Sequence, residues 1–95
     1  MSIEFEWDPD KAAKNLRKHK VSFEEAATVF RDTLSVTVPD PDHSAEEDRH
    51  ITVGLSSRLR LLMVSHIEWG EQIRIISARQ LTHQERNDYE KGNWD

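Results

Sequence analysis

The chain has 95 residues, a net charge of −5 at pH 7 and no cysteine, which fits one domain over residues 1–95. The absence of cysteine excludes disulfide scaffolds, thiolate zinc sites, iron–sulfur clusters and cysteine nucleophiles. The N-terminus lacks the pattern of a signal peptide and no long apolar window is present, so we expect a soluble, cytoplasmic protein without a membrane segment.

The N-terminal residues predict a short strand followed by a helix. Apolar and polar residues alternate from Ile3 to Trp7, as they do along a strand. Asp8 is a suitable N-cap, and Pro9 suits the first helical position, where its missing N–H group costs nothing. We expect this helix to end at about His19 with a thin apolar face.

A second helix is predicted directly afterwards. Ser22 and Glu25 have the spacing of a capping box, in which each side chain satisfies the other residue's backbone N–H group. The helix should run to about Arg31. Its core face follows a 3.6-residue repeat and contains Phe23, Ala26, Ala27 and Phe30.

From Leu34 onward the hydrophobic period changes to two, which predicts strands. We expect four of them, over residues 34–38, 50–56, 59–68 and 72–80. The segment 61–64 is apolar on both parities, so its strand should be central with both sheet faces covered. Three short connections favour an antiparallel meander, with a solvated acidic loop from Asp40 to Asp48.

A terminal helix is predicted from Thr82 to about Gly92. Thr82 and Glu85 have the spacing of a second capping box. Apart from Tyr89, this helix has almost no apolar residue. It should therefore be either loosely docked or present for the groups that its side chains contact.

The charge is distributed unevenly along the chain. Residues 1–48 carry 12 acidic and 6 basic side chains, whereas residues 49–86 carry six arginines and only three glutamates. The planar guanidinium of arginine suits the geometry of phosphate. Solvated strand edges that resist aggregation explain the same residues equally well.

Metal sites are not predicted. The histidines have no paired metal-ligand spacing, and they are His19, His43, His50, His66 and His83. The H-x-E triplet that begins at His66 lacks the Cys-x-x-Cys partner of zinc deaminases. The acidic loop lacks the spacing and the glycine of an EF-hand. We therefore expect no metal and no cofactor.

Side chains suited to phosphate binding and proton transfer gather in the last two predicted strands and the terminal helix. They are Arg58, Arg60, His66, Glu68, Arg74, Arg79, Arg86 and Tyr89. Each has a purely structural alternative. His66 and Tyr89 could pack at the edge of the core, Glu68 and Arg74 could form an exposed strand pair, and Arg86 could solvate the helix.

Whether these groups converge depends on the register of the last hairpin. A two-residue turn at Trp69 and Gly70 would place His66 opposite Ile73, and Arg60 opposite Arg79. A three-residue loop would instead place His66 opposite Arg74. In both registers His66 and Glu68 share a face with at least one arginine, and the sequence does not choose between them.

Several segments of the chain match a known pattern. They are residues 5–8 (FEWD), 19–27 (HKVSFEEAA), 40–43 with Arg49, and 73–79 (IRIISAR) followed by Glu85, Arg86 and Tyr89. With these motifs the chain resembles the BrnT toxin family from Phe5 to about Gly92, and the Arg-Ile-Ile-Ser-Ala-Arg segment is the most specific.

The resemblance implies an α+β, RelE-like fold, with an antiparallel sheet of about four to five strands, two N-terminal helices and a short C-terminal helix. It also implies a metal-independent endoribonuclease without a cofactor, acting as the toxin of a type II toxin–antitoxin system that inhibits translation and growth. The implied partner is a BrnA-type antitoxin, whose ribbon-helix-helix domain binds operator DNA. The toxin would meet operator DNA only through this antitoxin, and the oligomer, a homodimer or a higher complex, is left open.

By the same resemblance, Arg74 and Arg79 would contact the scissile phosphate and its developing charge. Arg58, Arg60 and Arg86 would help to bind RNA. His66 or Glu68 would be the general base on the ribose 2′-hydroxyl, and the other of these two, or Tyr89, would be the acid. RelE-type ribonucleases are usually basic, so this acidic chain must rely on a local arginine surface. The alternative is a binding module of the same fold that acts without catalysis as a corepressor with its antitoxin.

Overall fold

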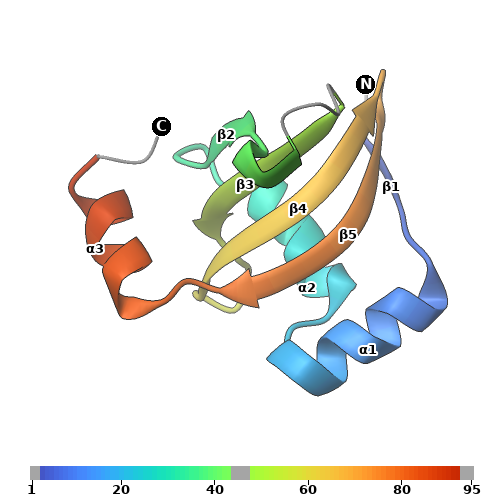
Figure 1. The fold of residues 1–95 in the computed structure, drawn as a ribbon, viewed down its shortest axis with the longest axis horizontal. Helices are drawn as coiled ribbons and strands as arrows, with labels where there is room; N and C mark the ends of the chain where they lie inside the picture. Colours follow the sequence, from blue (N-terminus) through green and yellow to red (C-terminus); the bar gives the residue numbers. More distant parts are fainter. Residues whose placement is uncertain (1–2, 44–47, 93–95) are drawn as a thin grey trace.

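The computed structural model describes residues 3–43 and 48–92. Within these ranges, five strands form one sheet in the order β1-β5-β4-β3-β2. The strands are β1 (Glu4–Glu6), β2 (Val36–Pro39), β3 (Arg49–Leu55), β4 (Leu61–Trp69) and β5 (Gln72–Gln80). In Figure 1, α2 (Phe23–Thr28) crosses behind the sheet, α1 (Pro9–His19) lies beside β5, and α3 (His83–Glu90) stands apart near one end. The predicted α+β class and order of elements are confirmed.

The first helix begins and ends as local chemistry requires. The Asp8 carboxylate accepts a hydrogen bond from the Asp10 N–H group at 2.9 Å, which confirms Asp8 as the N-cap. The helix ends at Lys20, whose φ of 60° is in the left-handed region and whose N–H group donates to the Leu16 carbonyl. Glycine is the usual residue at such a position, so Lys20 adopts this conformation at some cost.

The second helix is short and is extended by a 3-10 turn over Val29–Arg31. The Ser22 hydroxyl accepts a hydrogen bond from the Glu25 N–H group at 3.0 Å, as predicted. The prediction of a second capping hydrogen bond, from the Ser22 N–H group to the Glu25 carboxylate, is wrong. This carboxylate accepts hydrogen bonds from Arg60 and Ser56 instead. The predicted core face is confirmed, since Phe23 and Ala26 are fully buried and the other two residues pack against the core.

The strands from β2 to β5 form the predicted antiparallel meander. The first strand differs from the prediction, because β1 pairs with β5 in parallel and makes the sheet mixed. Only three residue pairs join these strands, from Glu4 opposite Gln72 to Glu6 opposite Arg74. Beyond them, Asn15 of α1 takes over the edge of β5: its side-chain amide donates to the Ala78 carbonyl and accepts from the Ala78 N–H group.

The last hairpin has neither of the two expected registers. Trp69 pairs with Gln72, so the two-residue turn consists of Gly70 and Glu71, one position later than expected. Gly70 has a φ of 58°, which suits the first position of such a turn. A bulge then shifts the pairing, because His66 faces Ile75 whereas Ser65 faces Ser77, which leaves Ile76 as the extra residue.

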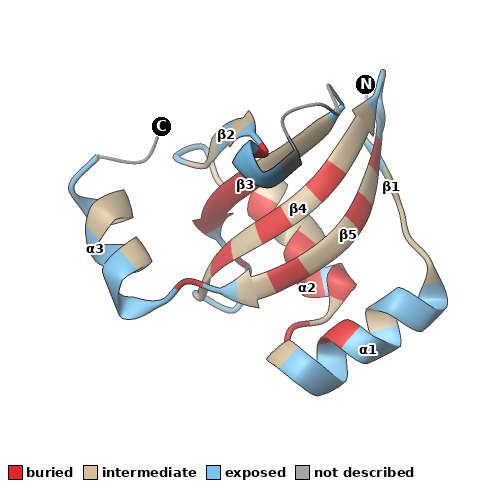
Figure 2. Cartoon of the chain, viewed as in Figure 1, coloured by how far each residue is buried: buried red, intermediate tan, exposed pale blue. Residues whose placement is uncertain are grey.

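The hydrophobic core lies on one face of the sheet, between the sheet and the first two helices. In Figure 2, buried and half-buried segments alternate along β4 and β5. Leu62 and Val64 are fully buried, whereas the intervening Leu61 and Met63 are half-buried. The central position of β4 is confirmed. The expectation that both sheet faces are covered at residues 61–64 is wrong. The face away from the first two helices, which carries Leu61 and Met63, is only partly shielded.

The terminal helix has the predicted capping box in full. The Thr82 hydroxyl accepts from the Glu85 N–H group, and the Glu85 carboxylate accepts from the Thr82 N–H group. No residue of α3 is buried. In the acidic loop, Pro41–His43 form a 3-10 turn, while residues 44–47 lie outside the described residues. Among the described residues, no helix has the length and apolar character needed to cross a membrane.

Candidate functional site

The face of the sheet opposite the first two helices carries two of the candidate arginines, Arg74 and Arg79. Residues that oppose each other across strands share a face, and the register defines this surface in three rows. We call it the open face, and its residues are Val53, Met63 and Arg79; Ile51, Ser65 and Ser77; and Arg49, Ile67 and Arg74. All of them are half-buried except Val53, which is fully buried. Two serines therefore lie between two arginines along one apolar surface.

Arg79 joins the end of β5 to the first turn of α3. Its Nη1 and Nη2 atoms donate to the two carboxylate oxygens of Glu85 at 2.7 and 2.9 Å. The same nitrogens also donate to the Gln80 carbonyl and lie 3.3 Å from the Met63 sulfur. The hydrogen bonds from Arg79 lower the pKa of Glu85 to about 2, and Glu85 in turn raises the pKa of Arg79. Both groups are therefore charged at neutral pH.

Arg74 lies at the opposite end of β5 and is paired more loosely. Its Nη1 atom donates to the Glu6 carboxylate on β1 at 2.8 Å, and both side chains are about 40% exposed (40% and 41%). Arg74 and Arg79 share the open face, but five residues of extended chain separate them by roughly 15 Å. A single phosphate would not contact both, whereas two phosphates that are not adjacent on one strand could.

His66 lies on the opposite face of β4, within the core. Its side chain is fully buried, its Nε2 atom is 2.7 Å from the Thr52 hydroxyl, and its ring packs edge-on against Phe30. Burial lowers the pKa of His66 to about 4, and the charge of His50 contributes in the same direction. The imidazole is therefore neutral at pH 7. It does not reach the open face, so a bound RNA strand there would not touch it.

Glu68 stays at the surface on the same side of β4 as His66. Its Oε2 atom lies 3.5 Å from Nδ1 of His50 and 3.7 Å from Nδ1 of His66, and the side chain is 39% exposed. No group of three or more His, Asp or Glu side chains in the described ranges is arranged to hold a metal ion. Glu68 is therefore accessible, but it is not on the face that carries Arg74 and Arg79.

Arg60 has a structural environment. Its Nε atom donates to Glu25 at 2.9 Å, and its Nη2 atom donates to the same carboxylate and to the Lys20 carbonyl. The hydrogen bond from Arg60 lowers the pKa of Glu25 against the opposing effect of burial, with a further contribution from Ser56. Arg58 is 71% exposed and lies 3.8 Å from the same carboxylate. These two arginines thus belong to the junction of α2 with the β3–β4 turn rather than to the open face.

The two candidates in α3 differ in their contacts. The Tyr89 hydroxyl donates to the Leu34 carbonyl at 2.9 Å, and burial raises the pKa of its phenol, with Asp32 adding to the effect. Arg86 is exposed. The helix is thus held at its start through Arg79 and near its end through Tyr89, although none of its residues is buried.

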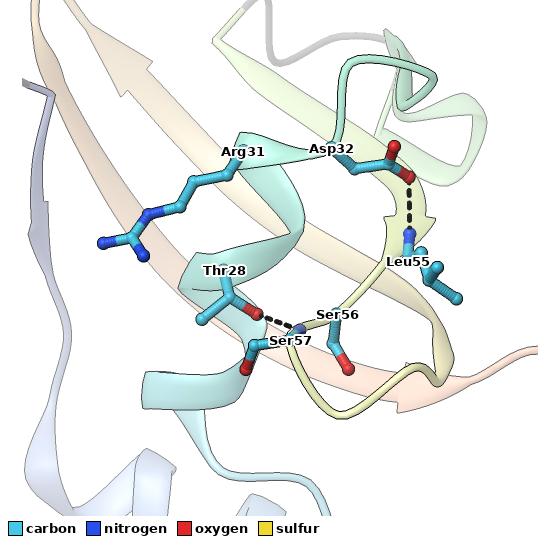
Figure 3. Close-up of a pocket in the computed structure, with 6 residues that line it drawn as sticks. All are labelled: Thr28, Arg31, Asp32, Leu55, Ser56 and Ser57. Atoms are coloured by element: carbon cyan, nitrogen blue, oxygen red, sulfur yellow. Dashed lines mark hydrogen bonds between the residues drawn. The ribbon is translucent and has the colours of Figure 1, made fainter.

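Most polar groups that line a hollow near the β3–β4 turn are used in hydrogen bonds within the protein (Figure 3). The Thr28 hydroxyl accepts from the Ser57 N–H group at 2.8 Å, and the Asp32 carboxylate accepts from the Leu55 N–H group at 2.8 Å. The Ser56 hydroxyl donates to Glu25. These contacts fasten the turn to α2 and the following 3-10 turn, so we do not assign the active site to this hollow.

Sequence reasoning missed one arginine of the open face and the partner of another. Arg49 lies opposite Ile67, in the row that ends at Arg74. Arg49 lies two and four positions before Ile51 and Val53, so the alternation along the strand could have placed all three on one face. The pairing of Arg74 with Glu6 had no signal, because it depends on the parallel position of β1.

Comparison with known proteins gives a consistent assignment. The family model described as "Ribonuclease toxin, BrnT, of type II toxin-antitoxin system" matches residues 7–85. The fold is similar to the crystal structure of the Brucella abortus ribonuclease toxin BrnT, with a TM-score of 0.68 and 20% sequence identity over 86% of this chain and 100% of that chain. No curated protein sequence matches the chain.

Proposed function

Because the chain belongs to the BrnT family of ribonuclease toxins of type II toxin–antitoxin systems, we propose that it is an endoribonuclease that cleaves RNA on its open face. The observation that supports this location is the presence of Arg74 and Arg79 on one partly exposed sheet face, with Ser65 and Ser77 between them. In the cell such an enzyme would act in the cytoplasm, where it would inhibit translation and growth.

The proposed reaction needs no metal and no cofactor. The ribose 2′-oxygen attacks the adjacent phosphorus, the bond from phosphorus to the 5′-oxygen breaks, and the products are a 2′,3′-cyclic phosphate and a free 5′-hydroxyl. Arg79 would bind the non-bridging oxygens of the scissile phosphate and stabilise the charge that develops there. Arg74 would hold a phosphate farther along the same strand, because about 15 Å separates the two arginines.

Binding of phosphate by Arg79 requires exchange with Glu85. The carboxylate occupies the two guanidinium nitrogens that a phosphate would use in a bidentate contact. A phosphate offers two oxygens with similar spacing, so it competes directly for this position. The released Glu85 would keep its second hydrogen bond, to the Thr82 N–H group, and would stay at the edge of the open face.

For proton transfer, the structure favours the accessible candidates. His66 is fully buried and its hydrogen bond to Thr52 joins neighbouring strands, so we assign it a structural role. Glu68 and Tyr89 both reach the surface, but Glu68 lies on the side of β4 away from Arg74 and Arg79, so Tyr89 is the candidate for proton transfer on the open face. In the resting structure, the Tyr89 hydroxyl would first have to leave the Leu34 carbonyl.

The proposed partner is an antitoxin of the BrnA type, with a ribbon-helix-helix domain that binds operator DNA. The toxin would reach the operator only through this partner. The acidic N-terminal half of the chain offers an anionic surface, and we therefore expect the contacting segment of the antitoxin to be basic.

A second candidate function is a binding module without catalysis. It is favoured by one observation: the terminal nitrogens of Arg79 already bind Glu85, the Gln80 carbonyl and the Met63 sulfur. In this reading the chain acts only as a corepressor with its antitoxin.

Purified protein and a short RNA separate the two functions. The enzyme predicts fragments that end in a 2′,3′-cyclic phosphate, formed equally well in the presence of a chelator, together with growth arrest when the gene is induced alone. Intact RNA and normal growth would favour the module. Cleavage that stops on addition of the chelator would contradict the metal-independent mechanism.

A further inference from the structure

One face of α1 forms a basic wall beside β5. Lys11, Lys14 and Lys18 have the i, i+3, i+7 spacing that places side chains on one helix face. Together with Asn15, His19, Ile76 and Ser77 they line a shallow hollow of about 320 Å³, near the lower end of the range for ligand sites. We call this surface the lysine groove.

The groove has a rigid base. Asn15 lies between the lysines and is buried, and its side-chain amide donates to the carbonyls of Val21 and Ala78 and accepts from the Ala78 N–H group. These bonds fix the distance between α1 and β5. The exposed lysines on either side are therefore presented at a constant position over the strand.

The charges of the groove are available for an external ligand. In the part of the chain that the structure describes, none of the three lysines has a carboxylate within ion-pair distance, whereas Arg60, Arg74 and Arg79 each do. The whole chain carries a net charge of −5, so this positive surface is a local feature. A polyanion is the class of ligand that three unneutralised cations in a row attract.

The position of the groove suggests which polyanion it takes. Its far wall is the bulged segment of β5, where Ile76 is the extra residue and Ser77 belongs to the open face. A strand that lies on the lysines can therefore continue over the edge of β5 toward Arg74 and Arg79. Lys11 and Lys18 are about 10 Å apart along the helix axis, so the three lysines can contact more than one phosphate of the same strand.

We propose that the lysine groove binds the sugar–phosphate backbone of single-stranded RNA outside the cleavage site and leads it onto the open face. This inference rests on the proposed ribonuclease function. The lysines contact phosphates only, so the groove adds affinity without sequence preference. It also explains how an acidic chain recruits RNA, because the binding energy comes from counterion release at one local surface.

The test compares two triple variants. Lys11→Gln/Lys14→Gln/Lys18→Gln removes the groove charges, and Arg17→Gln/Arg31→Gln/Lys91→Gln removes three exposed charges that do not line it. Binding of a fluorescent, non-cleavable 2′-O-methyl RNA is measured by anisotropy at several salt concentrations. We expect the groove variant to lower the slope of log affinity against log salt by about 2, uniformly across RNA sequences. The control should change the slope by less than half of that.

Equal slopes for the two variants, at matched melting temperatures, would overturn the proposal. Unchanged RNA binding by the groove variant, together with loss of antitoxin co-purification, would also overturn it and would assign the lysines to the protein partner. Cleavage is assayed separately on an RNA of the same sequence. If the wild type binds but does not cleave and the slope still falls, the groove stands and the ribonuclease proposal fails. If the wild type cleaves and the slopes are equal, only the groove fails.

Discussion

Two arginine–glutamate pairs in this chain share a geometry and differ in their surroundings. In each, one guanidinium donates to both carboxylate oxygens of a glutamate: Arg60 binds Glu25, and Arg79 binds Glu85. Only 4% of the Glu25 side chain is exposed, against 24% of Glu85. The first pair lies between α2 and the β3–β4 turn, whereas the second lies at the edge of the open face.

The difference in exposure decides what each pair can do. A buried carboxylate that loses its partner is left as an uncompensated charge, so the Arg60 pair is fixed for as long as the chain is folded. At the edge of the open face, solvent or another anion can replace the carboxylate, so the Arg79 pair can open. The same two residue types therefore form a structural contact in one place and an exchangeable anion site in the other.

The largest effect is expected from breaking the buried pair. Arg60→Ala should lower the free energy of unfolding by about 3 kcal/mol, because Glu25 would remain buried without its main partner. Urea denaturation measures this change. Arg58→Ala is the matched control, since Arg58 is 71% exposed and 3.8 Å from the same carboxylate, and it should cost less than about 1 kcal/mol. Equal costs for the two variants would mean that the pair is not structural.

The exposed pair should matter more for cleavage than for stability. Arg79→Ala should slow single-turnover cleavage by about 10²- to 10³-fold, the usual loss for a group that stabilises developing charge. Arg74→Ala should weaken RNA binding and cleavage, while Arg79→Lys should restore activity only in part because an ammonium is not bidentate. Melting temperatures of the same variants serve as the control. Wild-type cleavage by both alanine variants would contradict the assignment of the active site to the open face.

The capping role of one of the two glutamates was predictable from the sequence. Thr82 and Glu85 were identified as a capping box from their spacing, and both hydrogen bonds are present. Ser22 and Glu25 have the same spacing, yet Glu25 turns away to Arg60, which is 35 residues distant in sequence. The capping-box pattern covers only four consecutive residues. It therefore cannot predict that a residue distant in sequence competes for the carboxylate.

The relative position of the site residues was not predictable. The bulge at Ile76 lies within the apolar pair Ile75 and Ile76, where the pattern shows no sign of an extra residue. That one residue places Arg79 on the same face as Arg74, which lies five positions earlier. The burial of His66 was equally hidden, because it depends on Thr52 and Phe30 from other elements.

The pH dependence of stability should show whether Arg79 and Glu85 are paired in solution. The pKa of Glu85 is lowered from 4.5 to about 2. Its contribution is therefore complete above pH 4.5 and is lost as the pH falls toward 2. With solvent screening of a partly exposed group, this amounts to about 2 kcal/mol.

Glu85→Gln should remove the loss of stability between pH 4.5 and 2. The variant should still lose stability as the pH falls from 6.5 toward 4. This loss comes from His66, whose pKa is lowered to about 4 in the folded protein. Thermal melts of both proteins across this range make the comparison. Parallel curves for the wild type and the variant would show that Arg79 does not hold Glu85 in solution.

The smallest effect is expected at the caps, where Thr82→Ala should cost about 1 kcal/mol. Because no residue of α3 is buried, this loss should appear mainly as faster amide exchange within α3, with only a small drop in the global melting temperature. Ser22→Ala is the matched variant: it removes the cap of α2, which is packed in the core, so it should lower global stability by a similar amount.

The two cap variants also separate structure from toxicity. Thr82→Ala loosens the helix that carries Arg86 and Tyr89, so it should reduce growth arrest at matched expression even though the fold persists. Ser22→Ala leaves the open face intact and should retain toxicity at temperatures where the protein stays folded. If Thr82→Ala frees the amides of α3 and toxicity is unchanged, then α3 contributes nothing to cleavage, and Arg79 acts independently of the carboxylate that holds it.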